Sequence, residues 1–239
     1  MIERHLARLR SRHEVSEADV ALIRGAIGEM RECPAGKTII EAGKRLESST
    51  LLIDGLMCRY KDMRDGQRQI AEIHVPGDFL DLHSYTLKQL DHNVLSLTPC
   101  RVVVLAHADI RRITRASEQL AFLYWFSTNL DASIHREWVV SLGRRDALSR
   151  AAALFCELQA RLEIVGLAGP TGFDLALNQI ELAECLGLTS VHVNRTLKQL
   201  RERALVTFRQ GRVTIHDLPG LRRVAEFDPA YLYLGKQPG

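Results

Sequence analysis

The chain has 239 residues, of which 46% are apolar and 26% charged, values typical of a folded soluble protein and not of a disordered one. Its net charge of +3 is too small to indicate a polyanionic partner by itself. The cysteines are far apart and contain no Cys-x-x-Cys pair: Cys33, Cys58, Cys100, Cys156 and Cys185. We therefore expect a cytoplasmic protein with reduced thiols and no metal site.

Residues 1–12 predict a short amphipathic helix instead of a signal peptide, because charged side chains interrupt the apolar ones. The most apolar run, residues 120–126, is far shorter than the roughly 18 residues that a membrane span requires. We expect no association with a membrane.

From Pro34 to about Leu105, short apolar runs alternate with turn residues, a pattern typical of an antiparallel barrel or sandwich. The runs are Thr38–Ile40, Leu51–Ile53, Met57–Tyr60, Gln69–Ile73 and Arg101–Leu105. Two Asp-Gly pairs, Asp54-Gly55 and Asp65-Gly66, predict hairpin turns, and the second is the stronger signal.

After Ala108 a long segment without Gly or Pro ends near Gly143 and repeats apolar residues at helical spacing. One stripe consists of Leu123, Leu130, Ile134, Trp138 and Leu142. We expect this stripe to be the interface with a second copy of the chain. The alternative is that it packs on its own β domain, because its spacing drifts from a strict heptad.

A second helix is predicted from Asp146 to Leu162, with one apolar side formed by Leu148, Ala152, Phe155, Leu158 and Leu162. The Gly-rich stretch 166–172 then predicts a loop.

Two helices separated by a tight turn follow. Asn178 and Glu181 match a capping box, and Gly187 suits the left-handed conformation that ends a helix. Thr189 can cap the second helix, which we expect to run to about Arg203. This arrangement predicts a helix-turn-helix.

On the second helix, Val193, Leu197 and Leu200 are expected to form the buried face. The exposed residues at its N-terminal end suit the reading of bases in the major groove, with Arg195 for guanine and Val191 for a thymine methyl group. Asn194 suits either adenine or a phosphate. The complete predicted DNA-binding set is Thr189, Ser190, Val191, His192, Asn194, Arg195, Lys198 and Arg212.

Residues 205–208 and 212–215 alternate apolar and polar side chains around Gln210-Gly211, which predicts the wing of a winged helix. Between residues 189 and 212 six cations stand against one acid, a local charge of +5. The cations are Arg195, Lys198, Arg201, Arg203, Arg209 and Arg212. Double-stranded DNA is therefore the expected partner.

With these residues in view, the chain resembles the family of the cyclic-AMP receptor protein and the fumarate-nitrate reduction regulator. The resemblance covers nearly the whole chain and is most specific over residues 179–200. In the N-terminal half it rests on Leu51–Gly55, Asp65-Gly66 and Val75–Asp78. It implies a homodimeric transcription regulator that binds a palindromic operator, with RNA polymerase as a candidate partner. Its base-reading positions fall on Ser190, Val191 and Arg195.

The expected fold class is α+β, with an N-terminal β-roll similar to a cyclic-nucleotide-binding jelly roll, a long dimerisation helix and a C-terminal winged helix-turn-helix. We place the sensor domain at 1–117, the dimerisation helix at 118–145, the DNA-binding domain at 146–228 and a C-terminal tail at 229–239.

The predicted effector pocket consists of Gly77, Asp78, Phe79, Leu80, Leu90 and Asp91. Members of the family that bind cyclic nucleotides hold the phosphate with an Arg-Ser pair, yet Lys88 is the only cation between Asp81 and Pro99. A buried phosphate without a cation is costly, which argues against cyclic AMP. A single early cysteine, Cys33, argues against an iron-sulfur cluster.

Haem stays open through His74, His83 or His92, and the identity of any small-molecule effector stays open too. We find no motif of an enzyme and expect no catalytic residues. The alternative to a DNA-binding regulator is a small-molecule-binding protein whose helix-turn-helix is a protein-docking module.

Overall fold

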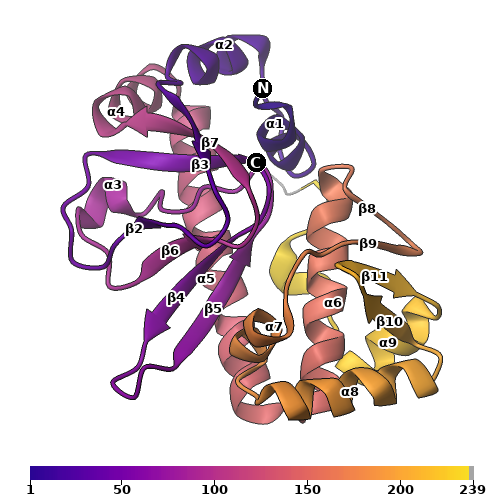
Figure 1. Cartoon of the computed structure of the whole chain (residues 1–239). Coiled ribbons are helices and arrows are strands. Elements are labelled where there is room, and N and C mark those ends of the chain that lie inside the picture. The colour runs from indigo at the N-terminus through magenta and orange to yellow at the C-terminus, as the bar shows by residue number, and fades with distance from the viewer. Residues whose placement is uncertain (237–239) are drawn as a thin grey trace. The chain divides into compact units, whose positions relative to one another are not determined.

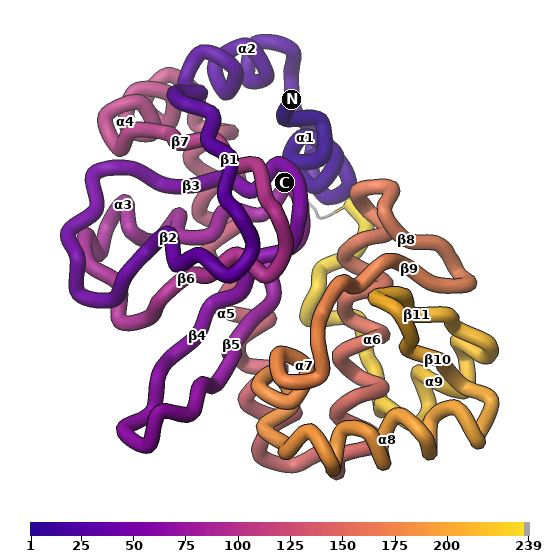
Figure 2. Tube along the Cα trace, viewed as in Figure 1, coloured from indigo at the N-terminus to yellow at the C-terminus, as the bar shows by residue number. Residues whose placement is uncertain are grey.

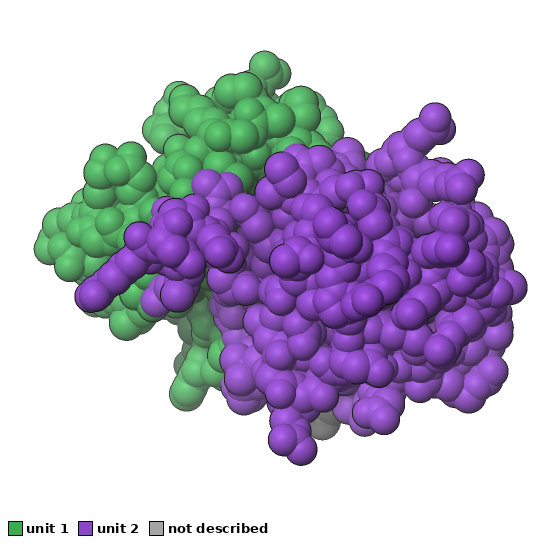
Figure 3. Space-filling view, turned by 60° about the horizontal axis from the view of Figure 1, so that its bottom comes forward, with its two compact units in different colours: residues 1–60, 73–133, 233–239 green, residues 61–72, 134–232 purple. Residues whose placement is uncertain are grey.

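The computed structural model describes residues 1–236, and the chain divides into two compact units (Figures 1 and 3). Of the described residues, unit 1 comprises 1–60, 73–133 and 233–236, and unit 2 comprises 61–72 and 134–232. Three elements contribute residues to both units: β4 (Met57–Asp62), β5 (Arg68–His74) and the long helix α5 (Glu118–Arg144). Within residues 1–236, no helix is long and apolar enough to cross a membrane.

The N-terminal half is built on two antiparallel sheets, with strand orders β1-β7-β3 and β2-β6-β4-β5 (Figure 2). The remaining strands are β1 (Met30–Cys33), β2 (Thr38–Ile40), β3 (Ser48–Asp54), β6 (Asn93–Ser96) and β7 (Cys100–Ala106). The helices of this half, before α5, are α1 (Glu3–Arg10), α2 (Glu17–Gly25), α3 (Ser84–Leu87) and α4 (His107–Ala116). The predicted antiparallel β domain is confirmed.

Strand β3 is buried on both faces, because successive side chains of a strand point in opposite directions. Leu51 and Ile53 join a core that also contains residues of α1, α2, α4 and α5. Leu52 points the other way, into a second core with residues of β4, β6 and β7. This explains why β3 reads as a continuous apolar run.

The two Asp-Gly pairs have different outcomes. Asp65-Gly66 lies between β4 and β5, which are neighbours in one sheet, so the predicted hairpin is confirmed. Asp54-Gly55 connects β3 to β4, and these strands belong to different sheets. The hairpin predicted at Asp54-Gly55 was therefore wrong, and Gly55 instead turns the chain from one sheet to the other.

The long helical segment is interrupted at Ser117, which is extended and separates α4 from α5. The Ser117 hydroxyl accepts a hydrogen bond from the Leu120 amide at 3.1 Å and donates to Asp19 at 2.6 Å. A serine at this position caps the new helix, which a search for Gly or Pro does not detect.

The apolar stripe that was predicted to face a second copy is mostly buried within one chain. Four of its members are 7% exposed or less, and the fifth, Leu142, is partly buried. They are Leu123, Leu130, Ile134 and Trp138. The large apolar residues that α5 does expose are different ones, namely Phe122, Trp125, Val139 and Val140. Periodicity marks a buried face without telling which partner buries it.

Helix α6 (Ala147–Ile164) is capped by Asp146 and is the central helix of unit 2. Every residue from 151 to 162 is buried, including Glu157, Gln159 and Arg161. The prediction of a single apolar side was therefore too narrow, because α7, α8 and α9 pack around this helix.

The rest of unit 2 contains three helices, one 3-10 helix and a small sheet of order β10-β11-β9-β8. The helices are α7 (Gln179–Leu186), α8 (Ser190–Glu202), α9 (Leu218–Ala225) and η1 (Pro229–Leu232). The strands are β8 (Ala168–Gly169), β9 (Gly172–Asp174), β10 (Val206–Arg209) and β11 (Arg212–Ile215). The predicted loop at 166–172 was wrong, since much of it forms the β8–β9 hairpin.

The C-terminal tail begins with an anchored segment. Leu232 is fully buried, and the Tyr231 hydroxyl donates to Glu157 at 2.9 Å. The end of the predicted tail, residues 237–239, lies outside the described residues. The predicted domain limits at residues 117, 145 and 228 stay a prediction.

Candidate nucleic-acid interface and sensor region

Local hydrogen bonds fix the start of α7 and the turn that follows it. The Asn178 side chain accepts bonds from the amides of Ile180 and Glu181, both at 2.9 Å, and the Glu181 carboxylate accepts from the Asn178 amide at 2.8 Å. Gly187 ends the helix at φ 59°, and the Thr189 hydroxyl accepts from the His192 amide at the start of α8. The predicted caps are therefore confirmed: Asn178, Glu181 and Thr189 form the expected hydrogen bonds, and Gly187 adopts the expected left-handed conformation.

The buried face of α8 consists of Val193, Thr196 and Leu200, each 2% exposed or less. Leu197, predicted to be buried, is only partly so. Burial of Thr196 leaves no hydroxyl donor unsatisfied, because this hydroxyl donates a hydrogen bond to the His192 carbonyl of the same helix at 2.9 Å.

The opposite face of α8 is exposed over its N-terminal turns. Val191 is 81% exposed, and Asn194, Arg195 and Lys198 are exposed as well. Ser190 and His192 are partly buried. Within residues 1–236 Arg195 forms no ion pair, whereas Lys198 lies 3.6 Å from Glu202. The side chain that was the strongest prediction for a guanine contact is thus accessible and uncompensated.

The wing is a hairpin of β10 and β11, in which Phe208 pairs with Val213 and Arg209 with Arg212. Gln210 and Gly211 both have positive φ, 50° and 72°, which matches the twist of a two-residue hairpin turn. Arg212 was predicted to contact DNA, but it forms an ion pair at 2.6 Å with Asp174 of β9. The sequence analysis did not predict this acidic neighbour, because it did not predict that β9 pairs with β11 and so places Asp174 opposite Arg212.

The predicted effector residues differ in burial and do not belong to a single core. Asp78 and Leu80 are buried, Leu80 and Leu90 belong to the same apolar core, and the Asp91 side chain is 78% exposed. Gly77 adopts φ +96°, and a Cβ there would lie 2.7 Å from Cδ of Arg8 and 2.9 Å from the carbonyl oxygen of Arg4. Helix α1 therefore packs directly on this turn.

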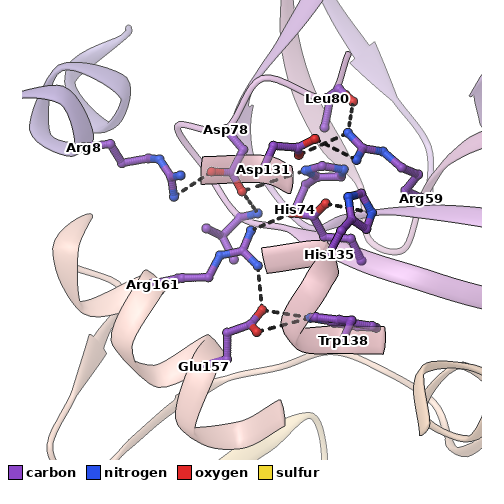
Figure 4. Close-up of polar contacts among 12 residues, drawn as sticks. Arg8, Arg59, His74, Asp78, Leu80, Asp131, His135, Trp138, Glu157 and Arg161 are labelled. Atoms are coloured by element: carbon purple, nitrogen blue, oxygen red, sulfur yellow. Dashed lines mark hydrogen bonds and ion pairs between the residues drawn. The ribbon is translucent and has the colours of Figure 1, made fainter. Parts of the chain in front are cut away.

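Two polar contacts join α1 to the turn. Arg8 forms an ion pair with Asp78 at 2.6 Å, drawn in Figure 4, and His5 Nδ1 lies 3.0 Å from the Gly77 carbonyl oxygen. Burial lowers the pKa of His5 to about 4, so at neutral pH the ring is uncharged. The N-terminal helix α1 thus lies against the Gly77-Asp78 turn, which is part of the segment Val75–Asp78 that carries the family resemblance.

A cation near the effector region escaped the sequence analysis. Arg59 of β4 is 3% exposed and donates to the Leu80 carbonyl at 2.8 Å and to Asp131 of α5 at 3.0 Å (Figure 4). The search for a cation covered only the chain from Asp81 to Pro99, so a residue on another strand was missed. The available signal was a charged residue inside the apolar run of β4.

Asp81 lies at the centre of a buried polar cluster with Thr50, Ser84 and His107. Its carboxylate accepts from the Thr50 amide at 2.5 Å, and Ser84 Oγ lies 3.1 Å from His107 Nε2. Burial raises the pKa of Asp81 to about 7, against the lowering effects of the Thr50 amide and of Arg59. This carboxyl group therefore titrates near neutral pH.

The three histidines considered for haem are placed in two separate positions. His83 and His92 face each other with ring centroids 5.5 Å apart. His74 is buried with Nδ1 4.0 Å from Asp78. Haem ligation through any of them stays a hypothesis.

A β domain, a long helix and a winged helix-turn-helix with an exposed cationic face define a DNA-binding regulator by class. Residues 30–117 match the cyclic nucleotide-binding domain, and residues 149–224 match the Crp-like helix-turn-helix domain. The transcriptional activator protein FnrL of Cereibacter sphaeroides is 26% identical over 190 residues, 77% of this chain and 75% of FnrL.

The transcriptional activatory protein AadR of Rhodopseudomonas palustris is 30% identical over 165 residues, 67% of this chain and 66% of AadR. In fold the chain is similar to FixK2 from Bradyrhizobium japonicum, with a TM-score of 0.74 and 21% identity, covering 82% of this chain and 96% of that one. The chain belongs to the Crp/Fnr family of DNA-binding transcription regulators, which are not enzymes.

Proposed function

We propose that the protein binds a palindromic DNA operator as a homodimer, with one α8 in the major groove of each half-site. The observation that carries this proposal is the exposed N-terminal face of α8, where Arg195 has no ion-pair partner within residues 1–236. Two copies related by a twofold axis read two inverted half-sites, which is why a palindrome is expected.

Arg195 is the proposed guanine reader, because its planar fork can donate twice to the guanine edge. Val191, 81% exposed, suits contact with a thymine methyl group. On the wing, Arg209 is exposed and outside any ion pair in the described part of the chain, whereas Arg212 is paired with Asp174. We therefore assign the phosphate contact of the wing to Arg209 before Arg212.

The proposed dimer interface is a stripe of exposed residues along α5, here called the exposed stripe. We propose it in place of the stripe that was predicted from the sequence, whose residues are mostly buried within one chain. The members of the exposed stripe follow a strict alternation of three and four residues, the spacing of a coiled-coil seam. They are Phe122, Trp125, Asn129, Ala132, Arg136, Val139 and Gly143, all of them exposed. Trp125 and Val139 are each 70% exposed, and a second copy of the same helix would cover both.

We further propose that the sensor domain does not bind cyclic AMP. Asp78 is already paired with Arg8, and Arg59, the buried cation of this region, is already paired with Asp131. A cyclic phosphate would have to replace Asp131 as the partner of Arg59, leaving a carboxylate to be resolvated.

The test is selection of binding sites from random double-stranded DNA, followed by measurements of affinity at several salt concentrations. We expect enrichment of an inverted repeat and a steep salt dependence. Arg195→Ala should lose discrimination at one base pair per half-site by about 1–3 kcal/mol. The matched control Arg201→Ala removes an exposed cation further along α8 and should weaken binding to all sequences equally. Failure of the wild-type protein to enrich any sequence contradicts the proposal and favours a docking module.

A further inference from the structure

The side chains of Gln179 and Asn194 connect the two helices of the helix-turn-helix. Gln179 is the first residue of α7, and Asn194 lies one turn inside α8. Asn194 Nδ2 donates to Gln179 Oε1 at 3.1 Å, and both side chains lie at the exposed surface. The two helices adjoin in this region, as Figure 1 also shows.

An asparagine reads adenine only in one orientation of its amide. Its oxygen must accept from the exocyclic amino group while its nitrogen donates to N7. An exposed asparagine that nothing holds rotates about its side-chain bonds and loses that freedom on binding. The bond to Gln179 uses one hydrogen of Nδ2 and leaves the other hydrogen and Oδ1 for a partner outside the protein.

We propose that Gln179 is a positioning residue for sequence recognition: it orients the Asn194 amide for a bidentate contact with adenine. The inference rests on the proposed function, because it assumes that α8 reads DNA. It settles the choice left open for Asn194 in favour of a base, since a phosphate contact requires no fixed amide orientation.

Gln179 has no evident structural duty that would compete with this role. The N-terminal cap of α7 is supplied by Asn178 and Glu181. The Gln179 side chain is exposed, and alanine is at least as good a helix former as glutamine. Gln179→Ala should therefore leave the fold and the thermal unfolding midpoint unchanged.

The test is binding-site selection with the wild-type protein, three variants and one control variant. Asn194→Ala should lose the preference for A·T at one position of each half-site. Gln179→Ala should reduce the same preference about three- to tenfold, and only at that position, because the amide is no longer held. The double variant should have the profile of Asn194→Ala alone. Gln199→Ala, an exposed glutamine of α8, is the matched control and should keep the wild-type profile.

Gln179→Glu separates positioning from affinity. A carboxylate still accepts the bond from Asn194 Nδ2, so the A·T preference should return. Its negative charge near the DNA backbone should lower affinity for all sequences to the same extent. If Gln179 had only a structural role, Gln179→Glu would not combine a restored A·T preference with a uniform loss of affinity.

Three results overturn the inference alone, with the wild-type protein still selecting an operator. They are an unchanged profile for Gln179→Ala, a loss of affinity in this variant that is equal for all sequences, and an unchanged profile for Asn194→Ala. If the wild-type protein selects no sequence, the proposed function fails and the inference fails with it.

Discussion

Arg150 of α6 donates from Nη1 to the backbone carbonyl of Leu186, the last residue of α7. Its Nη2 donates to the carbonyls of Leu142 and Arg145 at 3.0 Å, and its Nε donates to Ser141 at 3.1 Å. The last carbonyls of a helix lack partners within the helix. One guanidinium thus satisfies the C-terminal ends of α5 and α7, and it holds the turn before α8 in place.

Arg150→Met should destabilise the protein and weaken DNA binding without changing the sequence preferred. Methionine retains the length of the stem but leaves partly buried carbonyls without donors, at a cost of about 1–3 kcal/mol. Arg150→Lys should rescue little, because an ammonium group cannot reach carbonyls on both helix ends at once. Chemical denaturation and binding titrations measure both effects. Arg144→Met, at an exposed position, is the control. A wild-type unfolding free energy in Arg150→Met would contradict this role.

Gly77→Ala should cost more stability than Gly66→Ala, although both glycines have positive φ, +96° and +81°. The backbone strain of alanine is similar at the two sites. A Cβ at Gly66 meets nothing within 4 Å, whereas at Gly77 it lies 2.9 Å from the Arg4 backbone and displaces α1. We expect an additional loss of about 1–3 kcal/mol at Gly77, measured by denaturation. Equal losses would mean that α1 is not fixed on this turn.

The helix-turn-helix could be predicted almost completely from the sequence, because each of its signals is local. Asn178, Gly187 and Thr189 act on amides or angles within four residues of themselves. The same holds for Asp65-Gly66, whose turn joins strands that are adjacent in sequence. Asp54-Gly55 has the same composition, but which sheet receives the next strand is decided by distant pairing.

Contacts between distant segments could not be predicted. Arg59 meets Leu80 and Asp131, which lie 21 and 72 residues away, and no spacing rule connects them. The buried network of Glu157 illustrates the same limit: it accepts from Trp138, Arg161 and Tyr231 on three elements (Figure 4 shows the first two). A sequence pattern assigns such charged residues to the surface, since charged groups are buried only when paired.

Asp81→Asn should change how stability depends on pH. The folded pKa of Asp81 is raised to about 7 by burial, above its value of about 4 in the unfolded chain. Its stabilising contribution is therefore complete below about pH 4 and is lost as the pH rises toward 7. A difference of this size corresponds to at most roughly 4 kcal/mol. Relative to Asp81→Asn, the wild-type protein should lose stability between about pH 4 and about pH 7, as measured by thermal unfolding. Parallel curves for the two proteins would contradict this prediction.

Trp125→Glu should dissociate the dimer, whereas Leu130→Ala should destabilise the folded chain. Trp125 is 70% exposed in one chain, so a charge there costs nothing until a second copy covers it. Leu130 is 5% exposed, and its truncation leaves a cavity that costs about 2–5 kcal/mol of unfolding free energy. Light scattering over a range of concentrations measures the first effect, and denaturation the second. Leu87→Glu on α3, at a site 64% exposed, is the control and should leave the dimer intact. If Trp125→Glu remains dimeric at micromolar concentration, the seam lies elsewhere than on the exposed stripe of α5.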